Sequence, residues 1–487
     1  MRRFHILSCI AAAVLLTVAA GGCVEPLYPD EVKKDPAARE LTVRIYLPAG
    51  MTSGTKAAAG SVSADAAENA LHEIQVWAYL HRSGATGADQ EGPVAYLAER
   101  IFSDSELAEN YIERTIVIPG HVMEMDASDL KFDFYVLGNA SSLGVTFTEP
   151  RKVTRGTLKK LTFGKKDNTN RFGDATTTTV PAEGLPMACF YNGEAGGGFD
   201  VSFLQYRFTD AQLNFIKMST SDYDLDDATL HLTQAQKNFL EGLGTFTSWS
   251  ELWEAFQEKC CPFLIIRRAV AKVRFVFAKA ESMEATETRI DKITFGDYSV
   301  PEQPEGVIPD STYVFPRESG NMSLPANTTY SHLEWTGSIP EHETTPAPLL
   351  SNDNIGLIDT PLRLRSDSDI ASAYDDDAHT CIPNSTTAQL YNQLLSYEVG
   401  KGHATEKVLY LRESDKPLQG RIYYHIGEEE KTPASFSMDG LSDTHFYFYR
   451  NCSWTVYAYF TSHGLEFQVT AAPWEWIPSS DLETSHL

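Results

Sequence analysis

The sequence has few cysteines, and their spacing suits neither a metal site nor a disulfide framework. Seven occur in 487 residues, and no C-x-x-C pair of the kind that binds zinc is present. Adjacent cysteines do not readily bridge each other, and an odd number remains beyond Cys23. We therefore expect small, buried, apolar side chains at Cys189, Cys260, Cys261, Cys381 and Cys452.

Positive charge is also scarce. The chain carries 40 Lys and Arg against 66 Asp and Glu, a formal net charge of −26. Such a chain repels nucleic acids and anionic membrane surfaces, so no nucleic-acid partner is expected.

Catalytic motifs are missing. The sequence contains no H-E-x-x-H, no G-x-S-x-G, no phosphate-binding loop and no G-x-G-x-x-G. Carboxylates are so numerous that a glycosidase pair is neither indicated nor excluded by them. We expect no enzyme, no catalytic residue, no cofactor and no metal.

Two acidic stretches are relevant to the expectation that no metal is bound. Asp222, Asp224 and Asp226 start a stretch like a calcium loop, but Asp227 replaces its glycine and Thr233 its final glutamate. We interpret it as a solvated turn. The stretch 366–379 is interpreted as a charged loop, and loose calcium binding there stays open.

The start of the chain has the features of an export signal. Arg2 and Arg3 precede an apolar run that is too short to span a bilayer, and small residues then lead to Cys23. We expect a signal peptide over 1–22 and lipidation of Cys23, with a lipidated leader over 23–40. Ordinary cleavage beside an incidental cysteine is the alternative. Several acyl chains would anchor the protein stably to a membrane.

Alternating apolar residues predict strands over most of the remaining chain. Leu41, Val43 and Ile45 share one face of a half-buried strand, and the stretches 72–80, 115–120 and 130–140 continue the pattern. In the last of these, Lys131, Asp133 and Tyr135 alternate with the apolar side. Many short strands with few helices indicate an all-β fold of β-sandwiches.

Helices are expected only as short decorations. Thr233-x-x-Gln236 and Ser248-x-x-Glu251 are capping-box patterns before helical segments of two or three turns. The stretch 263–280 is apolar and β-branched enough for one long strand through a buried sheet. We place a domain boundary at its start, giving an N-terminal β-sandwich over 41–261 and a C-terminal one over 262–487.

The end of the chain predicts a β-hairpin. Trp454, Val456, Ala458 and Phe460 can face Leu465, Phe467 and Val469 across the turn 461–464, where Gly464 supplies a left-handed residue. Most aromatic residues lie on such strands, which favours core packing over exposed binding platforms.

Taken in order, several motifs resemble the fimbrillins of Bacteroidia type V pili. They are the Cys23 lipobox, the strand LTVRIY, the stretch AENALHEIQVWAY, FDFYVLGNAS, LPMACFYNGE, RRAVAKVRF and the terminal hairpin with its Pro-Trp. The resemblance spans nearly the whole mature chain. It implies two transthyretin-like β-sandwich domains in a lipoprotein of the outer membrane and the extracellular fimbrium.

The resemblance also implies assembly by strand exchange. A trypsin-like protease cuts after an arginine, which releases an N-terminal strand and opens a groove in the first domain, and a strand of a neighbouring pilus subunit then fills that groove. Arg39 is the expected cleavage site, with Lys34 and Arg44 as competitors. A cut at Arg44 would break a strand that the alternation predicts to be folded.

Position within the pilus and adhesive role follow from the same resemblance. Only eleven residues without apolar alternation follow Trp476, so the chain is expected to accept a strand rather than donate one. A tip or accessory subunit that binds a surface receptor or glycan is therefore expected. The alternative is a surface glycan-binding lipoprotein of a polysaccharide-uptake system.

Overall fold

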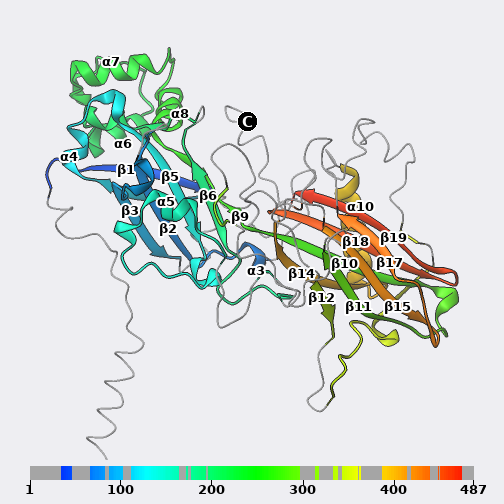
Figure 1. The fold of residues 1–487 in the computed structure, drawn as a ribbon. Helices are drawn as coiled ribbons and strands as arrows, with labels where there is room; N and C mark the ends of the chain where they lie inside the picture. The colour runs from blue at the N-terminus through cyan, green and yellow to red at the C-terminus, as the bar shows by residue number, and fades with distance from the viewer. Residues whose placement is uncertain are drawn as a thin grey trace, which may run out of the picture.

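The computed structural model describes most of the chain between Asp35 and Pro473 (Figure 1). The signal peptide, Cys23, Lys34, Cys381, the stretch 366–379 and the tail after Trp476 lie outside the described residues. The described residues are 35–46, 66–82, 87–101, 111–163, 172–173, 177–193, 196–296, 313–316, 333–337, 343–359, 361–362, 386–413, 418–438, 448 and 450–473.

Two sheets from the first half of the chain pack around one core. A three-stranded sheet has the order β4-β1-β8, and a six-stranded sheet has the order β3-β2-β5-β6-β9 with β7 paired to β5. The strands are β1 (Arg39–Tyr46), β2 (Glu73–Leu80), β3 (Ala95–Arg100), β4 (Tyr111–Ile118), β5 (Lys131–Gly138), β6 (Met187–Tyr191), β7 (Phe199–Asp200), β8 (Phe263–Ile265) and β9 (Arg267–Arg268).

The second half forms another pair of sheets. One has the order β13-β10-β18-β19 with β14 beside β10, and the other has the order β12-β11-β15-β16 with β17 beside β15. The strands are β10 (Val270–Ala280), β11 (Thr288–Gly296), β12 (Leu333–Thr336), β13 (Gly356–Ile358), β14 (Thr405–Arg412), β15 (Leu418–Ile426), β16 (Glu429–Glu430), β17 (Ala434–Met438), β18 (Cys452–Thr461) and β19 (Gly464–Pro473). The predicted all-β class is confirmed.

Helices are short and peripheral (Figure 1). The α-helices are α3 (Ala66–Asn69), α4 (Gly120–Met123), α5 (Arg155–Lys159), α6 (Asp210–Met218), α7 (Gln234–Gly242), α8 (Trp249–Cys260) and α10 (Thr386–Gly400). The 3₁₀ turns are η1 (Ala88–Gln90), η2 (Ala127–Asp129), η3 (Ala140–Leu143), η4 (Pro150–Lys152), η5 (Ser202–Tyr206), η6 (Ala228–Leu230), η7 (Glu281–Met283) and η8 (Asn352–Asn354).

The alternation in β1 is confirmed, whereas β2 and β5 are buried on both faces. Leu41, Val43 and Ile45 face the first core. On β5, the face predicted to alternate with the apolar one is also covered, because Asp133 and Tyr135 are 2% and 1% exposed. η4 and the residues that follow it cover this face: the indole N–H of Trp77 on β2 donates to the carbonyl of Pro150 in η4, 3.0 Å away, and Val153 lies in the same apolar cluster as Tyr135.

The predicted long strand over 263–280 is wrong. The stretch breaks into β8, β9 and β10, which belong to three different sheets. β8 runs parallel to β1, β9 pairs with β6, and only β10 joins the second pair of sheets. An apolar, β-branched sequence fits a buried strand in any sheet, so composition alone does not reveal where the chain changes partners. The division at residue 262 stays a prediction.

The two halves meet through a buried contact. Glu68 on α3 is completely buried, and its carboxylate lies 2.7 Å from the ammonium of Lys272 on β10. The hydroxyl of Tyr410 on β14 donates to the same carboxylate. In the opposite direction, Val314 and Phe315 pack into an apolar cluster with Tyr135 of β5. Each half therefore inserts a segment into the other.

The predicted terminal hairpin is confirmed. β18 and β19 pair antiparallel, with Val456 opposite Val469, Ala458 opposite Phe467, and Thr461 opposite Gly464. Gly464 has a φ of 145°, a conformation that favours glycine.

Candidate functional site at the start of the leading strand

The two edges of β1 are paired to different extents. β4 pairs with all eight residues of β1, from Arg39 opposite Ile118 to Tyr46 opposite Tyr111. On the other edge β8 pairs only with the last three residues, Arg44 to Tyr46. Among the described residues, no strand pairs with the second edge over Arg39–Val43.

The backbone pattern shows which groups face this half-open edge. The N–H of Arg44 donates to the carbonyl of Pro262, 3.1 Å away. Backbone groups alternate along a strand, so Glu40 and Thr42 direct their groups to the same edge as Arg44. The carbonyl of Thr42 accepts a weak bond from the Cys261 thiol at 3.4 Å, and η5 lies nearby.

The half-open edge lies directly above a formed core. Leu41 and Val43 are 1% and 0% exposed, while Glu40 and Thr42 are exposed on the outer face. A strand edge with available N–H and C=O groups over an apolar layer is the geometry that accepts another extended segment.

The residues before β1 form a turn that is fastened to α4. The Asp35 carboxylate accepts the N–H of Ala37 at 2.9 Å and the N–H of Gly120 at 2.8 Å. The carbonyl of Asp35 also accepts the N–H of Ala38 at 3.1 Å. The Gly120 N–H, followed by that of Ala37, lowers the pKa of Asp35 below its ordinary value. We call Asp35–Ala38 together with Gly120 the Asp35 clasp.

Arg39, the predicted cleavage residue, is the first residue of β1. Its guanidinium bends back and donates to the carbonyls of Pro36 at 3.3 Å and Ala38 at 2.5 Å. Its Nε is buried and has no hydrogen-bond partner within the described part of the chain. Burial, followed by the nearby charge of Arg207, lowers the pKa of Arg39. The side chain is therefore not presented to solvent as an extended arm.

Arg44, the competing site, lies inside the sheet where β1 has partners on both edges. Its Nε donates to Glu113 at 2.7 Å, and its guanidinium lies 5.2 Å from the ring centre of Tyr111. Whether the chain is cut at Arg39, Arg44 or Lys34 stays a prediction.

Four of the cysteines discussed above fall within the described residues. Cys189, Cys260, Cys261 and Cys452 are all buried free thiols. Burial raises the pKa of both Cys189 and Cys261 to about 12, so these groups are protonated at neutral pH. Their packing agrees with small apolar residues.

The aspartates of the stretch 222–233 have structural partners. Asp224 accepts the N–H of Asp226, and Asp226 pairs with Lys237 at 2.5 Å. Asp227 caps η6 by accepting the N–H of Thr229 at 2.8 Å. Over the described residues, no group of three His, Cys, Asp or Glu is arranged to hold a metal ion.

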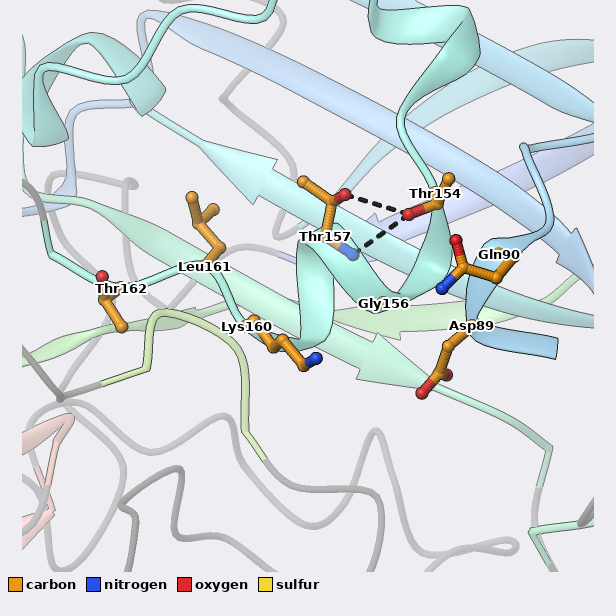
Figure 2. A pocket seen from close by; sticks show the side chains of 8 residues that line it. All are labelled: Asp89, Gln90, Thr154, Gly156, Thr157, Lys160, Leu161 and Thr162. Atoms are coloured by element: carbon orange, nitrogen blue, oxygen red, sulfur yellow. Dashed lines mark hydrogen bonds between the residues drawn. The ribbon is translucent and has the colours of Figure 1, made fainter. Parts of the chain in front are cut away.

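A shallow hollow of about 470 Å³ lies beside α5 (Figure 2). The side chain of Thr154 accepts the N–H of Thr157 there as the cap of α5, and Asp89 pairs with Lys159 at 3.1 Å. None of its lining residues is aromatic, so it offers no ring on which a sugar could stack. The lining residues are Asp89, Gln90, Thr154, Gly156, Thr157, Lys160, Leu161 and Thr162.

Sequence reasoning missed the Asp35 clasp. The signal was the stretch Asp-Pro-Ala-Ala before Arg39, because Asp at the first and Pro at the second position favour a turn. Nothing in the sequence indicated Gly120 as the partner, since the contact joins residues far apart in the chain.

No family model matches the chain, and no curated protein matches it. Solved structures do. The tip fimbrial protein Mfa3 from Porphyromonas gingivalis is 10% identical, with 90% of this chain and 100% of that chain covered and a TM-score of 0.35. A fimbrial assembly protein from Parabacteroides distasonis is 10% identical, with 89% and 95% covered and a TM-score of 0.33.

The chain is similar to fimbrial proteins. The fimbrial anchor protein Mfa2 from Porphyromonas gingivalis is a further example, 6% identical with 90% and 100% covered and a TM-score of 0.31. This is the group of proteins that the sequence motifs resemble. With identities this low and TM-scores this small, the likeness alone assigns no function to this chain.

No helix in the described ranges is both long and apolar enough to cross a membrane.

Proposed function

We propose that the chain is a structural and adhesive subunit of a cell-surface pilus, assembled by protease-triggered strand exchange. The observation that carries the proposal is the half-open edge of β1, which begins at the residue predicted to be cut. The edge is paired over Arg44–Tyr46 and lacks a paired strand over Arg39–Val43 among the described residues.

The physical step is addition of a strand. A cut after Arg39 separates the leader from β1 while β4 keeps β1 in place through eight paired residues. An incoming extended segment then pairs with the backbone groups of Glu40 and Thr42, and its alternate side chains cover the core beside Leu41 and Val43. The segment comes from another pilus subunit.

Lipidation at Cys23 is proposed to hold the unprocessed protein at the outer membrane, with its folded part on the extracellular face. Processing at Arg39 would separate the fibre-forming part from that anchor. We keep the tip or accessory position, and binding of a host or bacterial surface receptor or glycan, as parts of the same proposal.

Limited proteolysis tests the cleavage site. Incubation of the detergent-solubilised precursor with trypsin should yield a discrete core whose N-terminal sequence begins at Glu40. Arg39→Ala should abolish that product. Lys152→Ala removes a basic side chain that is 74% exposed, and it should leave the product unchanged.

Degradation of the whole chain without a stable core would contradict the proposal. A stable core that begins after Arg44 in the unaltered protein would move the cleavage site into the strand and would equally contradict it.

A further inference from the structure

The predicted cleavage residue lies in a closed conformation. A trypsin-like protease binds its substrate as an extended strand, and a deep pocket takes up the arginine side chain. Arg39 is not available to the protease, because it already belongs to β1 and the residues before it form a turn. Its backbone pairs with Ile118 on β4, and its guanidinium is bonded to the carbonyls of Pro36 and Ala38.

The Asp35 clasp keeps the preceding residues in this conformation. One carboxylate oxygen binds Ala37 within the turn, and the other binds Gly120 at the start of α4. The same side chain therefore shapes the turn and attaches it to the folded body. An extended path from Asp35 to Arg39 would require the bonds within the turn, from the N–H groups of Ala37 and Ala38 to Asp35, to break, and the bond to Gly120 holds this turn against α4.

Gly120 permits the attachment because it has no side chain. A Cβ at this position would lie 2.4 Å from the Cβ of Ala37 and 2.8 Å from the carboxylate oxygen of Asp35. Neither atom is at the end of a long flexible side chain, so the turn would have to move away from α4.

We propose that Asp35 and Gly120 are positioning residues that keep the Arg39 cleavage site closed, so that cleavage proceeds only through local opening of the Asp35–Ala38 turn. The inference rests on the proposed function, since it concerns the same cleavage site. It adds that the closed turn slows cleavage at Arg39 and thereby delays assembly of the unprocessed subunit.

The closed turn should determine the rate of cleavage at Arg39. When a site reopens and closes faster than the protease cuts, the cleavage rate follows the equilibrium population of the open form. Hydrogen bonds to a charged group stabilise a closed form more than neutral ones do. Loss of the Asp35 carboxylate should therefore raise the cleavage rate at Arg39 by about tenfold.

The experiment compares trypsin cleavage rates of the full precursor with those of Asp35→Ala and Gly120→Ala. Product bands are identified by N-terminal sequencing. Asp210→Ala is the matched control, because Asp210 is an exposed aspartate at the start of another helix, α6. We expect faster cleavage at Arg39 in both clasp variants, an unchanged rate in the control, and unchanged rates at other basic sites in all of them.

Three results would overturn parts of the account, and they differ from one another. Equal cleavage rates at Arg39 in the unaltered protein and both clasp variants would refute the proposed inhibition by the clasp, but not the proposal that Arg39 is the cleavage site. An equal acceleration at every basic site would also refute the inhibition by the clasp, since that indicates general destabilisation. If no variant releases a core that begins at Glu40, the proposed function itself fails.

Discussion

At the scale of single residues, Asn139 is a buried polar side chain whose hydrogen bonds connect the ends of several strands. It has a left-handed backbone, with a φ of 54°, and is completely buried. Its side-chain oxygen accepts the N–H of His72, and its amide nitrogen donates to the carbonyls of Ala70 and Leu185, each at 2.8 Å. One side chain thus joins the ends of β2, β5 and the approach to β6.

We predict that Asn139→Ala destabilises the protein by about 2–4 kcal/mol, because it leaves buried backbone groups without partners and places alanine in a left-handed conformation. Asn354→Ala, at an exposed asparagine, should change the free energy of unfolding by less than about 0.5 kcal/mol. Urea unfolding followed by tryptophan fluorescence measures both. Equal effects of the two substitutions would show that the Asn139 bonds contribute nothing specific.

Some residue roles were accessible from sequence and others were not. The alternation of Leu41, Val43 and Ile45 alone predicted a buried face, because every second side chain of a strand lies on the same face. Asp133 did not, since its burial depends on Arg155, whose guanidinium lies 2.9 Å away from a different part of the chain. Local pattern reveals faces, whereas ion pairs between distant segments require the fold.

At the scale of elements, the two predicted capping patterns both mark helix starts, but only one forms a reciprocal capping box. Thr233 and Gln236 form the predicted reciprocal capping box at the start of α7. Ser248 caps α8 by accepting the N–H of Glu251, and the Glu251 carboxylate accepts the N–H of Thr247 at 2.7 Å. Helix α6 was not predicted, although Thr209 and Gln212 form the same type of box at its start.

The two capping-box glutamines also contact each other. The amide of Gln236 donates to Gln212 at 3.3 Å, and to the carbonyls of Tyr206 at 3.0 Å and Arg207 at 3.3 Å. Both side chains are buried, so α6 and α7 are capped and joined by the same pair of residues.

We predict that Gln236→Ala lowers the free energy of unfolding by about 1–3 kcal/mol, because three backbone partners lose their bonds. The double variant with Gln212→Ala should cost less than the sum of the single variants, as expected for contacting residues. Gln234→Ala is the control, since Gln234 is exposed and bonds only to Asn238 among the contacts described. Thermal unfolding of the unaltered protein, the two single variants, the double variant and the control checks this, and additive costs would contradict the coupling.

At the scale of the whole molecule, two β bodies are joined by inserted segments rather than by a simple linker. The carboxylate of Glu68 reaches Lys272 in the second half. Within the second half, the guanidinium of Arg450 donates to Glu413 and to the carbonyls of the 313–314 segment, which packs beside Tyr135 of the first half. The sequence predicted the sandwiches but not this joint, because both segments lie among loops without periodic pattern.

The backbone connection between the two halves starts close to the half-open edge of β1. β8 ends beside Tyr46, and the chain passes through β9 into β10 within a few residues. A pull on a strand added beside β1 would therefore be transmitted to the second sandwich through continuous backbone.

Photo-cross-linking in pilus-producing cells tests the central claim most directly. A photoreactive amino acid replaces Thr42, whose side chain is exposed beside the half-open edge, and a second protein carries it at exposed Glu430 as the control. We predict a cross-link from position 42 to a strand of another pilus subunit, absent from position 430 and lost when Arg39→Ala is added. Assembled pili that contain the protein without any cross-link at position 42, or with one that persists in the Arg39→Ala background, would contradict the account.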